Sequence, residues 1–117
     1  MLADQILAKV EKAEEFLQMA EFAIDLSAWD AACSLLCTAA IHASDALIMS
    51  AGAVMQGRAE HNAAVAVLGR TVGKDAGSQL AFVLRYKAKS QYEARRCSRV
   101  EAAECLKRVT RLVERAR

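Results

Sequence analysis

The ten residues LRYKAKSQYE, at positions 84–93, bring together side chains that could bind phosphate. Arg85, Lys87, Lys89 and Tyr92 fall within eight positions. On a helix, Arg85 and Lys89 are four residues apart and share a face, and Tyr92 follows three residues later. A guanidinium, an ammonium and a phenol on one side suit an RNA backbone or a nucleotide phosphate. The alternative is a solvated helix end, where basic residues also complement the helix dipole.

The basic residues of the chain are concentrated in its last third. Residues 1–84 carry five basic and ten acidic side chains, whereas residues 85–117 carry eleven basic and four acidic ones. Arg95, Arg96 and Arg99 extend the basic segment beyond Tyr92. This asymmetry indicates an acidic partner, either nucleic acid or the acidic face of another protein. The alternative is internal, with an acidic N-terminal helix lying beside the basic C-terminal helix.

Two histidines are candidates for proton transfer. His42 precedes Asp45 by three residues, which places both on one face of an apolar helix. They form either a satisfied core pair or a pair that reaches a cleft and meets the basic segment at 85–89. His61 follows Arg58 at the junction of a loop and a helix, where ligand contacts are common. It has either a structural role at the surface or a functional contact.

The sequence contains none of the common motifs for nucleotide, metal or acyl chemistry. GxGxxG, the P-loop, HExxH and the nucleophile elbow are all missing. The four cysteines, at positions 33, 37, 97 and 105, form no CxxC pair, and we expect reduced thiols packed in a core. A zinc site built from Cys33, Cys37 and a histidine is the alternative. We therefore expect no cofactor and no metal.

Composition favours one compact helical domain spanning residues 1–117. Apolar residues make up 55% of the chain and aromatic residues only 5%, so the core must be built mainly from Ala, Leu, Val and Ile. There is no proline. The N-terminus lacks the apolar segment of a signal peptide, and no run reaches the roughly 18 apolar residues of a membrane span. These features predict a cytoplasmic protein with no membrane partner.

The apolar periodicity predicts an all-α fold, a four- to five-helix antiparallel up-and-down bundle. The expected helices cover residues 3–25, 28–51, 60–71, 75–90 and 99–116. Residues 52–59 and 91–97 are expected to connect them, with Gly52 ending the second helix and Gly69 and Gly73 limiting the third. Residues 28–51 are apolar nearly all round, which predicts the central helix. Ser27 with Asp30, and Ser98 with Glu101, are expected to form capping boxes.

The segment from Arg85 to Tyr92, RYKAKSQY, resembles the motif of HEPN domains. That motif is an Arg, a polar residue, three variable residues, a His, one further residue and a Tyr. The acidic first helix, the Ala-rich AAIHASDAL, the glycine-bearing loop before His61 and the capped last helix are similar to the family in order. The resemblance implies a small helical domain of the kind found in toxin–antitoxin, anti-phage and nucleotidyltransferase-linked proteins.

The resemblance places Arg85 at the position of the motif arginine and Ser90 at that of the motif histidine. In active members the arginine and histidine are thought to cleave RNA together without a metal. A serine has no pKa in a useful range and cannot replace a general base, so the resemblance implies lost catalysis and a retained phosphate surface. It also implies a homodimer and a cognate nucleotidyltransferase-type or antitoxin partner.

Three functions follow from these features. The first is a degenerate HEPN-like homodimer that contacts RNA or nucleotide phosphates through the 85–99 region, without full ribonuclease activity. The second is an active ribonuclease that uses Arg85 with a relocated His61. The third is a non-catalytic protein-interaction module whose basic last helix meets an acidic partner.

Overall fold

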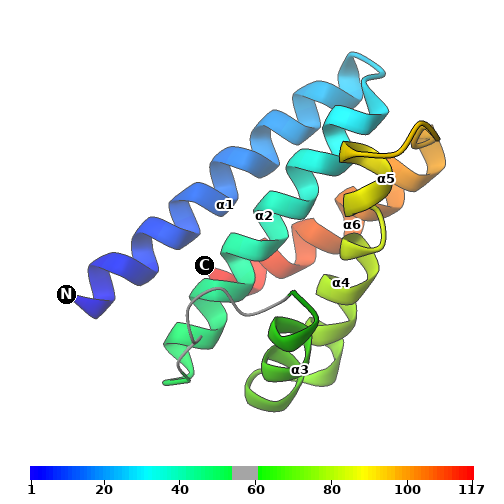
Figure 1. Cartoon of the computed structure of the whole chain (residues 1–117). Coiled ribbons are helices and arrows are strands. Elements are labelled where there is room, and N and C mark those ends of the chain that lie inside the picture. The colour runs from blue at the N-terminus through cyan, green and yellow to red at the C-terminus, as the bar shows by residue number, and fades with distance from the viewer. Residues whose placement is uncertain (54–60) are drawn as a thin grey trace.

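The chain folds into a bundle of helices, as a computed structural model shows. The structure describes residues 1–53 and 61–117, with no account of the His61 side chain. Figure 1 shows α1 and α2 as a long hairpin, α6 behind α2, and the shorter helices on the side of α2 away from α1. The helices are α1 Leu2–Asp25, α2 Trp29–Ser50, α3 His61–Thr71, α4 Lys74–Leu84, α5 Lys87–Gln91 and α6 Arg99–Ala116. The predicted all-α bundle is confirmed, and no strand occurs in the described residues.

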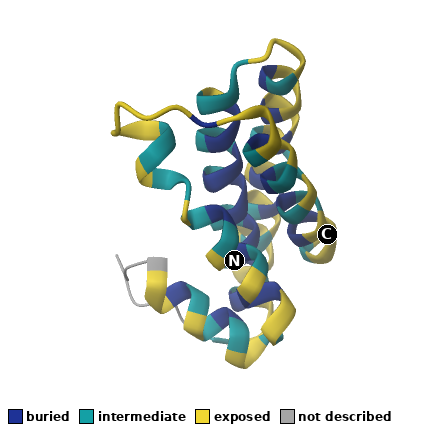
Figure 2. Ribbon diagram, turned by 90° about the vertical axis from the view of Figure 1, so that its right-hand side faces the viewer, coloured by how far each residue is buried: buried dark blue, intermediate teal, exposed yellow. Residues whose placement is uncertain are grey.

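The predicted central helix, α2, is confirmed. It contacts each of the other five helices. Its small residues Ala39, Ala40 and Ala43 are fully buried, which lets neighbouring backbones approach closely. Leu36 and Ile48 are also fully buried and supply the larger apolar volume. Figure 2 shows buried residues where helices face one another and exposed residues on the outer faces and connections.

The same helix, α2, is long and apolar enough to cross a membrane when judged by length and composition alone. More than half of its most apolar stretch is buried inside the bundle. The core helix of a soluble protein passes the same test. The burial of α2 therefore explains its composition without a bilayer.

One of the two predicted capping boxes is confirmed. At the start of α6, the Glu101 N–H donates to Ser98 Oγ at 3.1 Å, and the Ser98 N–H donates to Glu101 Oε1 at 2.8 Å. The prediction of a capping box at Ser27 and Asp30 is wrong, because Ala28 is the N-cap of α2 and no side chain caps that helix. Ser27 instead adopts a positive φ of 57° within a Schellman motif that ends α1, in which the Ala28 N–H donates to the Ala23 carbonyl.

The predicted single helix over 75–90 is also wrong, because α4 ends at Leu84. The N–H groups of Arg85 and Tyr86 donate to the carbonyls of Phe82 and Val83, which is a tighter turn than the α-helix allows. The chain then restarts as the five-residue α5, which packs against α2. Arg85 and Lys89 therefore do not share the face of one continuous helix.

Two glycines let α3 and α4 pack closely. The Cβ of a side chain at Gly77 would lie 3.2 Å from Gly69 Cα and 3.3 Å from the carbonyl oxygen of Val65. Gly69 lies inside α3 and does not limit it, which corrects the prediction from the sequence. Gly52 does follow the end of α2, with a φ of 79° that favours glycine. The rest of the predicted loop at 52–59 lies almost entirely outside the described residues.

We expect Gly77→Val to lower the free energy of unfolding by about 1–3 kcal/mol, because the added atoms meet backbone that cannot move aside cheaply. The matched control is Gly69→Ala, whose Cβ would meet nothing within 4 Å. Alanine favours a helix over glycine, so the control should be neutral or stabilise by about 0.5–1 kcal/mol. Urea unfolding checks both values, and equal effects of the two substitutions would contradict the close contact.

Candidate phosphate-binding surface

Arg85 projects from the end of α4 beside two aromatic rings. Its guanidinium carbon lies 5.3 Å from the centroid of the Phe82 ring and 5.9 Å from that of Tyr86. Both distances lie in the range of a cation–π contact. Arg85 is exposed, and its guanidinium forms no hydrogen bond or ion pair within residues 1–53 and 61–117. Its hydrogen-bond donors therefore remain open to an anionic ligand.

A second arginine, Arg108 of α6, lies over the same Phe82 ring. Its guanidinium carbon is 4.3 Å from the ring centroid, and its Nε donates to Glu104 Oε1 at 3.0 Å. Two guanidinium groups thus lie within cation–π range of one half-buried ring at the junction of α4 and α6, and the one from Arg108 is paired with Glu104. Arg108 was not predicted from the sequence, because its contact with Phe82 depends on how α6 packs on α4. Only its place in the basic last third pointed to it.

Lys89 is held by Glu101. Its ammonium lies 3.0 Å from both carboxylate oxygens of Glu101, and its side chain is 19% exposed. The hydrogen bond to Glu101 raises the pKa of Lys89, and the same bond lowers the pKa of Glu101. Because Glu101 also caps α6, Lys89 fastens α5 to the start of that helix. Because Glu101 already balances its charge, Lys89 should attract a phosphate less strongly than Arg85 does.

Three other residues predicted to contact phosphate, Lys87, Ser90 and Tyr92, lie in or next to α5 with Lys89. Ser90 Oγ donates to the Lys87 carbonyl at 3.2 Å, which satisfies the hydroxyl within α5. Lys87 begins α5 and is half-buried. Tyr92 follows α5 and is 78% exposed, so its phenol is open to solvent. Ser90 therefore lies in the last part of α5, and Tyr92 directly follows its end.

Arg95 and Arg96 each pair with a carboxylate. Arg95 Nε donates to Glu93 at 2.8 Å, and Arg96 Nε donates to Asp30 at 3.0 Å. Both guanidinium groups are mostly exposed, with side-chain exposures of 74% and 78%, and exposed ion pairs are weak. A ligand phosphate would compete with these carboxylates for the donors that they occupy, and the other guanidinium donors have no described partner.

Asp30 holds two distant residues and does not cap α2 as the sequence pattern predicted. Its Oδ1 accepts a hydrogen bond from the Cys97 N–H at 2.8 Å, while Oδ2 accepts the bond from Arg96. These bonds, the one from Cys97 first, lower the pKa of Asp30. The carboxylate therefore ties the connection between α5 and α6 to the first turn of α2.

His42 and Asp45 both face α1 and share no described hydrogen bond, and the buried Nδ1 of His42 has no hydrogen-bond partner among the described residues. His42 stacks on Phe16 with ring centroids 5.8 Å apart, and Asp45 accepts a hydrogen bond from Lys9 at 3.0 Å. Burial, followed by the charge of Lys9, lowers the pKa of His42. Neither residue bonds to Arg85 or Lys89 in the described part of the chain. No described contact therefore supports the hypothesis that His42 and Asp45 meet the basic segment.

Arg58 lies outside the described residues, and so does the side chain of His61, although the backbone of His61 begins α3. A functional contact by either residue stays a prediction. The expected alternative of an acidic N-terminal helix beside the basic C-terminal helix is met, because α1 packs against α6 and, within the described residues, Arg117 Nε donates to Glu14 at 3.1 Å.

All four cysteines are buried and unpaired, as predicted for core thiols. Cys37 Sγ donates to the Val83 carbonyl at 3.3 Å. Burial raises the pKa of Cys37 and that of Cys97 to about 12, so neither forms a thiolate near neutral pH. No group of three or more potential ligands is placed to hold a metal ion within the described residues.

The lowered pKa values of Asp30 and Glu101 predict that stability falls in acid. Their ordinary values are 3.8 and 4.5, and the folded chain releases both protons at lower pH than the unfolded chain does. The stabilisation is therefore complete above those ordinary values and is lost as the pH falls through the lowered ones. Urea unfolding at several pH values between about 6 and 3 measures this loss. Asp30→Asn with Glu101→Gln should flatten the dependence, and an unchanged slope would contradict the assignment.

The sequence model of the HEPN domain family matches residues 7–117 of the chain. No curated protein matches it.

Proposed function

The chain belongs to the HEPN domain family, and from this premise we propose that it binds RNA or nucleotide phosphates through a surface centred on Arg85. The observation that carries the proposal is the pair of guanidinium groups, from Arg85 and Arg108, on the Phe82 ring. Guanidinium groups bind phosphate oxygens through paired donors, and those of Arg85 are not engaged by any described carboxylate. The predicted contacts Lys87, Tyr92, Arg95 and Arg96 would extend this surface.

We further propose that the domain lacks full ribonuclease activity. The motif position of the proton-transfer histidine is occupied by Ser90, whose hydroxyl donates to the Lys87 carbonyl. A hydroxyl engaged with its own backbone and without a useful pKa is a poor general base. Arg85 alone can bind and polarise a phosphate, but it cannot move the proton of a 2′-hydroxyl.

The wider setting of the domain is part of the same proposal. A cytoplasmic homodimer would place two Arg85 surfaces within reach of one RNA. A toxin–antitoxin or anti-phage system, with a nucleotidyltransferase-type or antitoxin partner, is the context in which such a domain would act. The mass of the purified chain in solution tests the homodimer directly.

Ser90→His tests the lost catalysis. With a general base at the motif position, we expect metal-independent cleavage of RNA in the presence of a chelator, because a positioned proton-transfer group contributes roughly 10²–10⁴ in rate. Denaturing gels of a labelled RNA measure the cleavage. The control variant, Ser90→His with Arg85→Gln, should be inactive. A Ser90→His protein that binds RNA but does not cleave it would contradict the placement of Ser90 at the motif position.

A further inference from the structure

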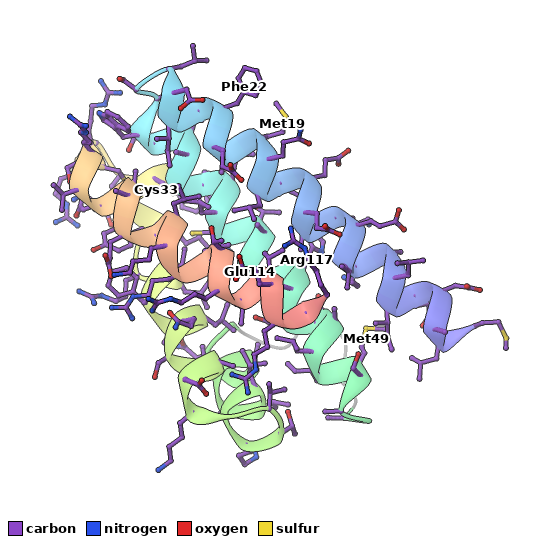
Figure 3. The ribbon with its side chains drawn as sticks, turned by 180° about the vertical axis from the view of Figure 1, so that it is seen from behind. Met19, Phe22, Cys33, Met49, Glu114 and Arg117 are labelled. Carbon is purple, nitrogen blue, oxygen red and sulfur yellow. The ribbon has the colours of Figure 1, made fainter. Side chains whose placement is uncertain are left out.

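The outer face of α1 exposes three large apolar side chains in a row. Met19, Phe22 and Leu26 are 49%, 60% and 74% exposed, and their spacing of three and four residues puts them on one stripe. Figure 3 shows Met19 and Phe22 projecting from α1 away from the other helices. Single exposed apolar residues need no explanation, but anchors at i, i+3 and i+7 have the spacing with which helices dock.

The apolar stripe lies among carboxylates that have no partner. Glu11, Glu15, Glu21 and Asp25 of α1 form no ion pair within the described residues, whereas Glu14 pairs with Arg117. Glu11 and Glu15, like Glu21 and Asp25, are four residues apart, so like charges adjoin along the helix. A cationic partner would relieve this repulsion. The face is therefore both apolar and acidic.

We infer that this face of α1 docks a basic amphipathic helix from another protein. The apolar side chains of such a helix would cover Met19, Phe22 and Leu26, and its flanking Lys or Arg side chains would pair with the unpartnered carboxylates. A second copy of the same face is a poorer occupant, because an isologous contact opposes carboxylates to carboxylates. The charge pattern thus selects the partner.

The docking face and the phosphate-binding surface lie on different sides of the molecule. In Figure 1, α2 lies between α1 and the helices α4 and α5 that carry Arg85. A protein partner on α1 would therefore leave the Arg85 surface open. The inference consequently stands apart from RNA binding and survives if that proposal fails.

The test uses the whole chain and two fluorescein-labelled synthetic peptides. One peptide is an 18-residue helix with a leucine stripe flanked by Lys and Arg, and the other has the same stripe flanked by Glu. We expect the basic peptide to bind at least tenfold more tightly than the acidic one in fluorescence anisotropy. Phe22→Ser should weaken its binding at least tenfold. The matched control is Leu7→Ser on the same helix, since Leu7 is 57% exposed but off the stripe, and it should leave binding unchanged.

Three results would overturn the inference. Equal affinity for the two peptides would show that charge does not select the partner. Equal effects of Phe22→Ser and Leu7→Ser would show that the stripe is not the docking site. A wild-type dimer, measured by sedimentation, that only Phe22→Ser makes monomeric would show that a second copy occupies the face.

Discussion

Replacing both Arg85 and Arg108 with glutamine is expected to lower the affinity for single-stranded RNA about 100-fold. A charged hydrogen bond to phosphate contributes about 1.5–3 kcal/mol, and each 1.4 kcal/mol changes affinity tenfold. Both guanidinium groups lie on the Phe82 ring, so the substitution removes the centre of the positive surface. Fluorescence anisotropy with a labelled oligonucleotide of about 12 residues, at fixed salt, measures the change.

The control for this prediction removes the same net charge elsewhere. Arg95→Gln with Arg96→Gln neutralises two arginines that pair with Glu93 and Asp30, as Arg108 pairs with Glu104, but that have no described contact with the Phe82 ring. We expect its loss of affinity to be several times smaller than that of the Arg85 and Arg108 variant. Equal losses would mean that RNA responds to net charge alone, which would contradict a site at the junction of α4 and α6. Circular dichroism of both variants checks that the helices are kept.

Leu36→Ala is expected to destabilise the domain more than any other change considered above, by about 2–5 kcal/mol. Leu36 is fully buried in α2, which contacts each of the other helices, so the cavity would open at the centre of the bundle. Domains of this size are stable by only about 5–15 kcal/mol, so the loss is a large fraction of the total. Urea unfolding followed by circular dichroism measures it.

The neighbouring leucine supplies the control. Leu35 is half-buried and packs only at the edge of the core. Truncating Leu35 to alanine leaves room for water to fill the space, so we expect a cost of about 1 kcal/mol. Similar costs at the two positions would contradict the placement of α2 at the centre.

Local patterns in the sequence predicted the helices and their order. The apolar periodicity of α1 and the Ser98 and Glu101 box identified two helices correctly, because these signals depend on neighbours within one or two turns. The break between α4 and α5 was missed, because neither Gly nor Pro marks Arg85 and Tyr86. Contacts to distant residues, such as that of Lys89 with Glu101, hold α5 in place. Such contacts cannot be read from spacing.

The candidate site was predicted in part for the same reason. Arg85 was found from a short motif, whereas Arg108 lies 23 positions later and reaches it only through the packing of α6 on α4. Asp30 looked like a capping residue, because a carboxylate three positions after a serine fits that pattern. Its bond to the Cys97 N–H spans 67 positions, so the pattern could not reveal it.

The salt dependence of RNA binding tests the phosphate surface most directly. For single strands, the logarithm of the association constant falls with the logarithm of salt concentration by roughly 0.7 for each phosphate neutralised. If Arg85 and Arg108 each neutralise one phosphate, glutamine at both positions should reduce this slope by about 1.4. An RNA affinity that does not change with salt, or a slope that the two substitutions leave unaltered, would contradict phosphate binding at this surface.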